Sequence, residues 1–325
     1  MSSPLLSLEG LGLELRVDGS YRTVIHQVDL TVGRGEAVGL VGESGSGKSL
    51  TARSVLRLLP PGARPRGDIR FDGVPVPQGG SSALRTFRST EIAMIFQDPR
   101  AHINPVRSIG DFLTEGLVTT RGLPRRQAEA KVVALLQEVG VADAARRMRQ
   151  HPHELSGGLL QRVMIAAALA AEPKLLLADE PTTALDVTTQ AEVMAIIDEA
   201  RAERGLAMVF ITHDLELAAA VCDRIAVMYA GSVVEDLPAD ALHDRSAHPY
   251  TRALLASRPS IGERGGTLRA IPGRPLSAFE VGAGCAFAPR CSRAQETCRT
   301  QRPSLSPVGK GNAACLFPGS EAPSV

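Results

Sequence analysis

The stretch AVGLVGESGSGKS, residues 37–49, decides the type of fold. An apolar run from Ala37 to Val41 leads into a glycine-rich turn, and an amphipathic stretch from Lys48 to Leu59 follows. This order predicts a strand, a loop and a helix. Glycines in such a loop let backbone N–H groups wrap phosphate oxygens, while the helix N-terminus faces their negative charge. The sequence therefore predicts a nucleotide phosphate site at residues 42–49.

Three later apolar runs predict further strands of an α/β fold. Leu175 to Ala178, Met208 to Thr212 and Ile225 to Tyr229 are short and alternate with helical patterns, as buried parallel strands of a doubly wound sheet do. The first of them ends at two acids, Asp179 and Glu180. Carboxylates at a strand end beside a phosphate loop are placed to hold Mg²⁺ and to activate water.

A second glycine-containing run lies between the phosphate loop and the acidic pair. It reads LSGG, residues 155–158, and is followed by Gln161 and Arg162. This ordered set resembles the signature of ABC-type ATPases. The resemblance implies a P-loop ABC nucleotide-binding domain, with a mixed sheet, a RecA-like core and a helical subdomain. It also implies a dimeric ATPase, because in that family the signature of one subunit completes the ATP site of another.

The ATP and Mg²⁺ site is expected from the phosphate loop and the first acid. Lys48 would bind the β and γ oxygens, Ser49 would offer its hydroxyl to Mg²⁺, and Asp179 would hold the ion from the other side. The expected cofactor-binding residues are Gly42, Ser44, Gly45, Gly47, Lys48, Ser49, Asp179 and, for adenine stacking, Tyr21. Tyr21 is the aromatic residue nearest to the position that relatives use; an ordinary strand residue is the alternative.

Three residues are expected to be catalytic. Glu180 would be the general base for the attacking water, and a solvated acid is the alternative reading. Gln97, after the strand-like run Ile92 to Phe96, resembles the Q-loop glutamine that contacts Mg²⁺ and water. His213, after a strand that ends at Thr212, resembles the switch histidine that contacts the γ-phosphate.

A further group is expected at the dimer interface. The helix that Ser156 opens would direct free N–H groups at the partner's γ-phosphate. A loop of small residues capping a buried helix is the alternative. Leu160 departs from the family pattern, because many members carry a polar or basic residue there. The expected signature and interface residues are Ser156, Gly157, Gly158, Gln161 and, by resemblance to the D-loop, Asp186.

The chain is expected to contain two domains. Residues 1–240 would form the nucleotide-binding domain, with a helical subdomain inserted at about residues 99–160. Beyond them periodicity fades, Pro and Gly become frequent, and four of the five cysteines appear. Residues 241–325 would therefore form an irregular, cysteine-rich C-terminal extension.

Three stretches narrow the resemblance to ATP-binding subunits of oligopeptide and dipeptide importers. They are IFQDPRAHINP (residues 95–105), HPYTRALL (residues 248–255) and the cysteine-rich tail. By its chemistry alone, the second stretch predicts a helix that begins at a proline and buries Leu254 and Leu255.

The clustered cysteines predict a metal site. Cys285, Cys291, Cys298 and Cys315 are separated by five, six and sixteen residues. Disulfides are disfavoured in a cytosolic chain, so a Cys₄ site is expected. Zinc sites commonly use paired C-x₂-C knuckles, which are absent here, and the tail is similar to family members that hold [4Fe–4S]. The iron–sulfur cluster is expected, with zinc as the alternative. Cys222 is expected to be a buried apolar residue.

Charge and hydropathy limit the partners. The formal charge is +1, and no long Lys/Arg run suggests nucleic acid binding. The longest apolar run, Val163 to Ala171, is far too short to span a bilayer, and no signal peptide is recognised. A soluble protein that binds peripherally to the cytoplasmic face of the cell membrane is expected.

The resemblance implies an ATPase that energises uptake of di- and oligopeptides through a separate permease. Its partners would be a second ABC ATPase subunit, homologous or identical, two transmembrane permease subunits and, indirectly, an extracytoplasmic solute-binding protein. Nickel-chelate, glutathione or another small solute is the alternative cargo. A soluble ABC ATPase that acts on ribosomes or DNA is the alternative class.

Overall fold

The computed structural model describes residues 3–183, 185–257 and 270–319. Its contacts divide the chain into two compact units. Unit 1 consists of residues 1–31, 37–75 and 211–325, and unit 2 consists of residues 32–36 and 76–210. The phosphate loop therefore belongs to unit 1, while the acidic pair and the LSGG run belong to unit 2.

A mixed sheet organises unit 1, with its strands in the order β5-β4-β1-β2-β10-β9-β3. The pairs β1/β4 and β9/β10 are antiparallel, whereas β3 and β9 run parallel. The strand bounds are β1 (Leu6–Val17), β2 (Ser20–Val32), β3 (Ala37–Val41), β4 (Arg64–Phe71), β5 (Val74–Pro75), β9 (Arg224–Tyr229) and β10 (Ser232–Pro238).

Strand β3 and helix α1 flank the phosphate loop as predicted. All five residues of β3 are buried, which explains its unbroken apolar run. Helix α9 (Leu215–Val221) packs against this strand. Helix α1 (Lys48–Val55) ends earlier than the predicted Leu59. The reason is local: Arg57 has a φ of 55°, and two prolines follow at positions 60 and 61.

The C-terminal segment joins the sheet of unit 1. Strand β12 (Gly311–Ala313) pairs with β10, with Ala313 opposite Glu235, and β11 (Ser306–Val308) pairs with β12. Short helices make up most of the rest. Their bounds are η2 (Ala239–Ala241), α10 (Leu242–Arg245), α11 (Pro249–Ala256), η3 (Ala278–Glu280), η4 (Ala288–Arg290) and α12 (Glu296–Thr300). A separate C-terminal domain beginning at residue 241 stays a prediction.

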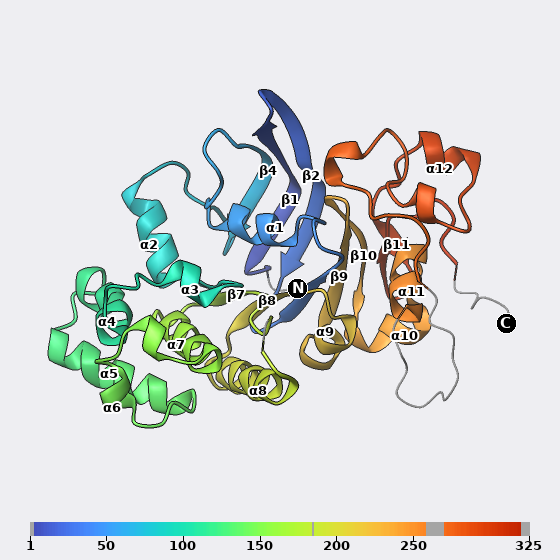
Figure 1. Cartoon of the computed structure of the whole chain (residues 1–325). Helices are drawn as coiled ribbons and strands as arrows, with labels where there is room; N and C mark the ends of the chain where they lie inside the picture. Colours follow the sequence, from blue (N-terminus) through green and yellow to red (C-terminus); the bar gives the residue numbers. More distant parts are fainter. Residues whose placement is uncertain (1–2, 184, 258–269, 320–325) are drawn as a thin grey trace. The chain divides into compact units, whose positions relative to one another are not determined.

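Unit 2 is mainly helical, as expected for residues 99–160. Helices α4, α5 and α7 pack on one another (Figure 1), and α5 buries Val132, Leu135 and Leu136. The helix bounds are α2 (Ser82–Thr90), α3 (Pro99–His102), α4 (Ile109–Thr119), α5 (Arg125–Glu138), α6 (Ala144–Arg147), η1 (Pro152–Glu154), α7 (Gly157–Ala170) and α8 (Val187–Arg204).

Three strands complete unit 2 and place the acidic pair. Strands β6 (Ile92–Ile95) and β7 (Leu175–Asp179) are parallel neighbours, and β8 (Ala207–Thr212) lies next to β7. The chain passes from unit 2 to unit 1 within β8, between Phe210 and Ile211. The strands predicted at 175–178, 208–212 and 225–229 are confirmed to within one residue at each end.

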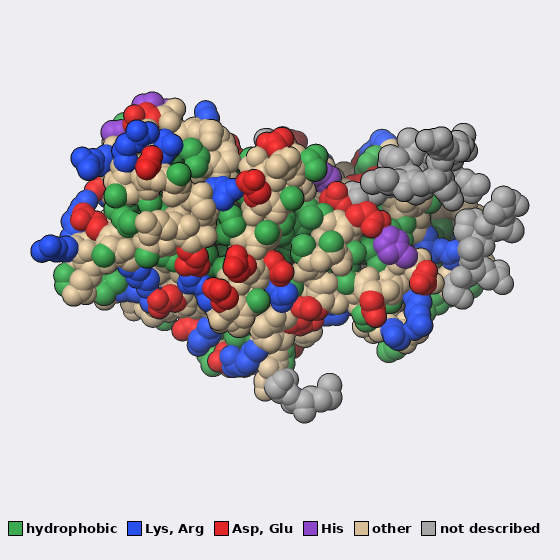
Figure 2. Space-filling model, turned by 90° about the horizontal axis from the view of Figure 1, so that it is seen from below, with side chains coloured by type: hydrophobic (Ala, Val, Ile, Leu, Met, Phe, Trp, Pro, Cys, Tyr) green, Lys and Arg blue, Asp and Glu red, His purple; other side chains and the backbone are tan. Residues whose placement is uncertain are grey.

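The face shown in Figure 2 carries acidic and basic side chains interspersed with apolar ones. No field of one charge covers this face, in keeping with the formal charge of +1. In the described part of the chain, no helix combines the length and the apolar character that crossing a membrane requires.

Candidate nucleotide site and cysteine cavity

Two glycines of the phosphate loop have conformations that other residues would disturb. A Cβ atom on Gly42 would lie 2.1 Å from the carbonyl oxygen of Met228, so no side chain fits there. Gly47, immediately before α1, has a φ of 104°. L-residues rarely adopt this conformation. The loop can therefore turn into the helix and stay close to β9 only with glycine at these positions.

Lys48 closes the loop from inside. Its side chain is buried, and its Nζ atom donates hydrogen bonds to the carbonyl oxygens of Gly42 (2.7 Å) and Glu43 (3.0 Å). The turn between β9 and β10 supports the same loop, because the N–H of Gly231 donates to the carbonyl of Ser46 at 2.9 Å. The loop thus fixes a lysine cation where nucleotide phosphates are expected.

Glu43 links the loop to the C-terminal segment, a connection that sequence reasoning missed. The Arg290 guanidinium binds both of its carboxylate oxygens, at 2.8 Å from Nη1 and 3.3 Å from Nη2. The N–H of Glu43 donates to the hydroxyl oxygen of Tyr250 at 3.1 Å. The available signals were an acid inside the glycine loop and an arginine among the cysteines.

The acidic pair in unit 2 is shaped by the end of β7. Asp179, the last residue of the strand, is fully buried. Glu180 has a φ of 46°, which is costly for a residue with a side chain. Its Oε2 atom accepts hydrogen bonds from Nε2 of Gln97 (2.9 Å) and from Oγ1 of Thr183 (2.8 Å). Two of the three expected catalytic residues are therefore in direct contact.

The expected ATP-site residues are divided between the units. Gly42, Ser44, Gly45, Gly47, Lys48, Ser49, Tyr21 and His213 belong to unit 1, and Gln97, Asp179 and Glu180 belong to unit 2. Ser44 and Gly45 are exposed in the loop, and His213 is exposed just after β8. Their union in one Mg²⁺–ATP site stays a prediction.

The LSGG run forms the start of α7. Ser156 is the N-cap residue, with Oγ accepting from the N–H of Leu159 at 3.4 Å, and Gly157 and Gly158 form the first turn. The exposed Ser156 and Gly157 leave this helix start accessible, as anion binding requires. Gln161 and Leu160 are instead buried. Leu160 contributes to the core, which explains an apolar residue at this position.

Asp186 caps the next helix. Its carboxylate accepts hydrogen bonds from the N–H of Thr189 (3.0 Å) and from its hydroxyl (2.7 Å), at the N-terminus of α8. These bonds hold the pKa of Asp186 below its usual value. The residue is exposed, so it can cap α8 and still meet a second subunit.

Tyr21 lies near the start of β2 with its ring against a cation. The guanidinium carbon of Arg64 is 3.5 Å from the ring centroid. A cation–π contact therefore already covers one face of the ring. Adenine stacking would have to use the other face or displace Arg64.

Helix α11 begins at a proline as predicted but buries other residues. His248 is its N-cap, and Nδ1 accepts from the N–H of Tyr250 at 3.1 Å. Tyr250 and Thr251 are the buried positions, whereas Leu254 and Leu255 are half-buried. The expectation that these leucines are core contacts is wrong, because the helix buries residues of its first turn instead.

All four clustered cysteines line one cavity in unit 1. Apolar side chains share its wall; the lining includes Cys285, Cys291, Cys298, Cys315, His248, Phe287, Leu316 and Phe317. The thiols form no disulfide, and burial raises the pKa of Cys285, Cys291 and Cys315.

No three potential ligands in the described residues are arranged to hold a metal ion. The predicted metal centre is therefore not supported by a formed ligand set, although the thiols do converge. Cys222, as expected, is buried apart from them.

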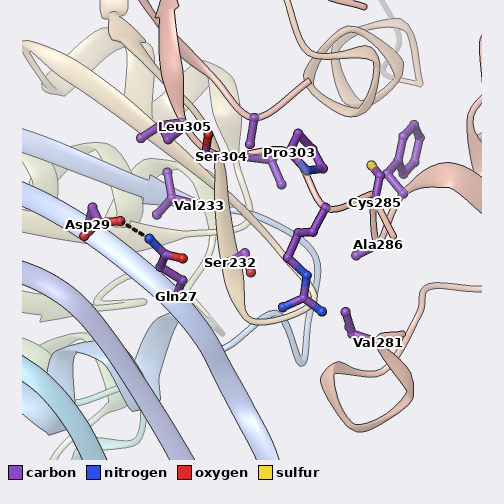
Figure 3. A pocket seen from close by; sticks show the side chains of 14 residues that line it. Gln27, Asp29, Ser232, Val233, Val281, Cys285, Ala286, Pro303, Ser304 and Leu305 are labelled. Atoms are coloured by element: carbon purple, nitrogen blue, oxygen red, sulfur yellow. Dashed lines mark hydrogen bonds between the residues drawn. The ribbon is translucent and has the colours of Figure 1, made fainter. Parts of the chain in front are cut away.

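A second cavity adjoins the first one. Gln27 and Asp29 of β2, Ser232 and Val233 of β10 and residues of the C-terminal segment line it (Figure 3). Gln27 donates to Asp29 at 2.9 Å. Cys285 lines both cavities.

Comparisons with known proteins agree with this arrangement. The family model described as ABC transporter matches residues 25–183, and the oligopeptide/dipeptide transporter C-terminal region matches residues 234–298. A protein of Brucella abortus (strain 2308) named as a peptide import ATP-binding protein is 44% identical over 315 residues. The match covers 97% of this chain and 95% of the relative.

Solved structures match about three quarters of the chain. The structure of cbiO1 from Clostridium perfringens, part of the ABC transporter complex cbiONQ, has a TM-score of 0.62 and 28% identity, covering 73% of this chain and 89% of its own. The ATP-binding cassette MJ0796, a dimer bound to ADP and Pi, has a TM-score of 0.65 and 26% identity, covering 72% and 98%. The chain therefore belongs to the ABC transporter family, among the ATP-binding subunits of oligopeptide/dipeptide importers.

Proposed function

We propose that this chain hydrolyses ATP to energise the import of di- and oligopeptides through a separate membrane permease. The hydrogen bond from Gln97 to Glu180 is the observation that carries the catalytic part, because it orients the expected base. The peptide import name of the Brucella relative and the matching C-terminal region support the transport part.

In the proposed site, the phosphate loop, the acidic pair, Gln97 and His213 take separate roles. Lys48 would bind the β- and γ-phosphates, Ser49 and Asp179 would hold Mg²⁺, and Gln97 would contact the ion and water. Glu180 takes a proton from the attacking water, and His213 contacts the γ-phosphate. Bound Mg²⁺ would neutralise charge on the phosphate oxygens.

The proposed assembly follows from the LSGG run. Ser156, Gly157 and Gly158 complete the ATP site of a second ATPase subunit, and Asp186 lies at that interface. Two permease subunits bind the pair at the cytoplasmic face of the membrane, and an extracytoplasmic binding protein delivers the solute.

Affinity purification of the tagged chain from native membranes tests this assembly. We expect a second ATPase and two permeases, identified by mass spectrometry. Reconstituted in vesicles with the binding protein, the complex should hydrolyse ATP faster when a dipeptide or oligopeptide is added. Stimulation of ATP hydrolysis by nickel chelates or glutathione, and not by peptides, would assign a different cargo. Recovery of ribosomal or DNA-bound partners without permeases would overturn the transport function.

For the cysteine cavity we propose a [4Fe–4S] cluster held by Cys285, Cys291, Cys298 and Cys315. Four thiols lining one cavity with apolar walls suit a cluster, which fills more space than a single ion. Bound metal would join the ends of a segment that contains little regular structure and would so stabilise its fold.

Anaerobic purification followed by iron, sulfide and zinc analysis tests the cluster. About four irons and four sulfides per chain are expected, with their loss in Cys298→Ala. Cys222→Ala is the matched control, because this buried cysteine lies outside the cavity, and it should keep the iron. One zinc per chain, or no metal, would contradict the cluster.

A further inference from the structure

We propose that Arg290 and Tyr250 of the C-terminal segment are positioning residues for the phosphate loop and act on ATP binding through Glu43. The inference rests on the proposed ATPase function of this loop. It assigns to the segment around the cysteines a direct part in the nucleotide site.

Arg290 is held as a rigid anchor. Its side chain is only 5% exposed, and its guanidinium meets four acceptors. These are both carboxylate oxygens of Glu43, the hydroxyl oxygen of Tyr229 at 3.4 Å from Nη1, and the carbonyl of Pro272 at 3.0 Å from Nε. A bidentate, largely buried ion pair fixes direction as well as distance. The carboxylate of Glu43 is therefore held in one place.

Tyr250 fixes the backbone of the same residue. The side chain is fully buried, and its hydroxyl oxygen accepts the N–H of Glu43 at 3.1 Å. Burial raises the pKa of Tyr250, so the acceptor is a neutral phenol. The peptide between Gly42 and Glu43 is thus oriented from outside the loop.

The orientation of this peptide reaches Lys48 directly. The carbonyl oxygens of Gly42 and Glu43 are the two acceptors of the Lys48 ammonium. A rotation of the Gly42–Glu43 peptide would move the first of these carbonyls. Arg290 and Tyr250 therefore set the position of the lysine that would bind the β- and γ-phosphates.

An aromatic cluster ties these anchors to the cysteine cavity. Phe287 lies with its ring centroid 5.4 Å from that of Tyr229 and 5.3 Å from that of Tyr250, and it lines the cavity. It is three residues before Arg290 in the same segment. Packing around the cysteines thus supports both anchors of the loop.

The experiment measures ATP affinity and steady-state hydrolysis in the full chain, with a fluorescent ATP analogue as the binding probe. Tyr250→Phe removes one oxygen, and Arg290→Gln removes the charge. Each should weaken ATP binding about three- to tenfold, as the loss of one hydrogen bond does, and raise KM for ATP more than it lowers kcat. Arg290→Lys should recover part of the affinity, because it restores the charge without the bidentate geometry.

A double-mutant cycle separates positioning from general stability. The double variant Glu43→Gln/Arg290→Gln should bind ATP no more weakly than the single variant with the lower ATP affinity. The reason is that each substitution removes the same ion pair. Arg274→Gln is the matched control: Arg274 forms an exposed bidentate pair with Glu280 in the same segment, and ATP affinity should not change.

Wild-type ATP affinity in Tyr250→Phe, Arg290→Lys and Arg290→Gln would overturn the inference, even if thermal unfolding shifted. Losses of ATP affinity that add up in the double variant would also overturn the inference. Failure of the wild-type chain itself to bind ATP would instead contradict the proposed function, so the two failures are distinguishable.

Discussion

Gln97 donates a hydrogen bond from Nε2 to Oε2 of Glu180 across 2.9 Å, although the two residues are 83 positions apart in the sequence. Thr183 donates to the same oxygen. Two donors on one carboxylate oxygen orient the group at the carboxyl end of β7. Such an orientation is what a general base requires before it can accept a proton from a bound water.

We expect Glu180→Gln to bind ATP normally and to lose turnover by at least about 10²-fold, because the amide retains the shape but not the basicity. Hydrolysis assays and analogue binding on the same preparation measure both effects. Glu203→Gln, an exposed position at the end of α8, should behave as wild type. Undiminished hydrolysis in Glu180→Gln would refute its assignment as the base.

Asp186→Asn and Asp186→Ala separate helix capping from an interface role. Asparagine preserves an N-cap acceptor for Thr189, whereas alanine removes it and should lower the free energy of unfolding. Chemical denaturation measures this difference. If Asp186 also acts at the dimer interface, both variants should lower ATPase activity; wild-type activity in the asparagine variant would limit the residue to capping.

Gly157→Ala and Gly158→Ala test the start of α7. A Cβ on Gly157 meets nothing within 4 Å, whereas one on Gly158 would lie 3.0 Å from Cγ2 of Thr189. Because alanine favours helix, Gly157→Ala should leave the free energy of unfolding unchanged or raise it by up to about 1 kcal/mol. Gly158→Ala should raise it less, because of the contact with Thr189. Turnover should fall in both, because the added methyl lies where a partner's phosphate is expected. Full activity in Gly157→Ala would argue against close approach of a phosphate.

The buried carboxyl group of Glu235 should make the free energy of unfolding depend on pH. Burial raises its pKa, so the folded chain binds this proton more tightly than the unfolded chain does. Its contribution to stability is therefore fully present below the unfolded pKa and is lost as pH rises through the higher folded pKa. Glu235→Gln removes the titration and keeps an acceptor for the N–H of Ala247.

Urea unfolding at several values between pH 4.5 and 8 checks this expectation, with each variant compared to wild type at the same pH. The stability of Glu235→Gln relative to wild type should rise as pH increases. Glu203→Gln, at the exposed end of α8, should give a difference that does not change in this way. A pH-independent difference for Glu235→Gln would contradict the buried titration.

Sequence patterns predicted the elements whose signals are local. The apolar run before Gly42 gave β3 and the loop, and the acids at 179 and 180 marked the end of β7. The buried face of α11 was predicted wrongly, because an eight-residue helix carries apolar residues on more than one side. The pairing of Glu43 with Arg290 had no periodic or motif signal, since it depends on how the C-terminal segment folds back.

The ion pair between Glu43 and Arg290 also sets an order of events during synthesis and folding of the chain. The two residues are 247 positions apart, and translation proceeds from the N-terminus. At about 5–20 residues per second, the phosphate loop is synthesised roughly 12–50 s before its arginine. A nascent chain therefore contains the complete glycine loop before Arg290 has been added. The loop can adopt its final geometry only when synthesis is nearly finished.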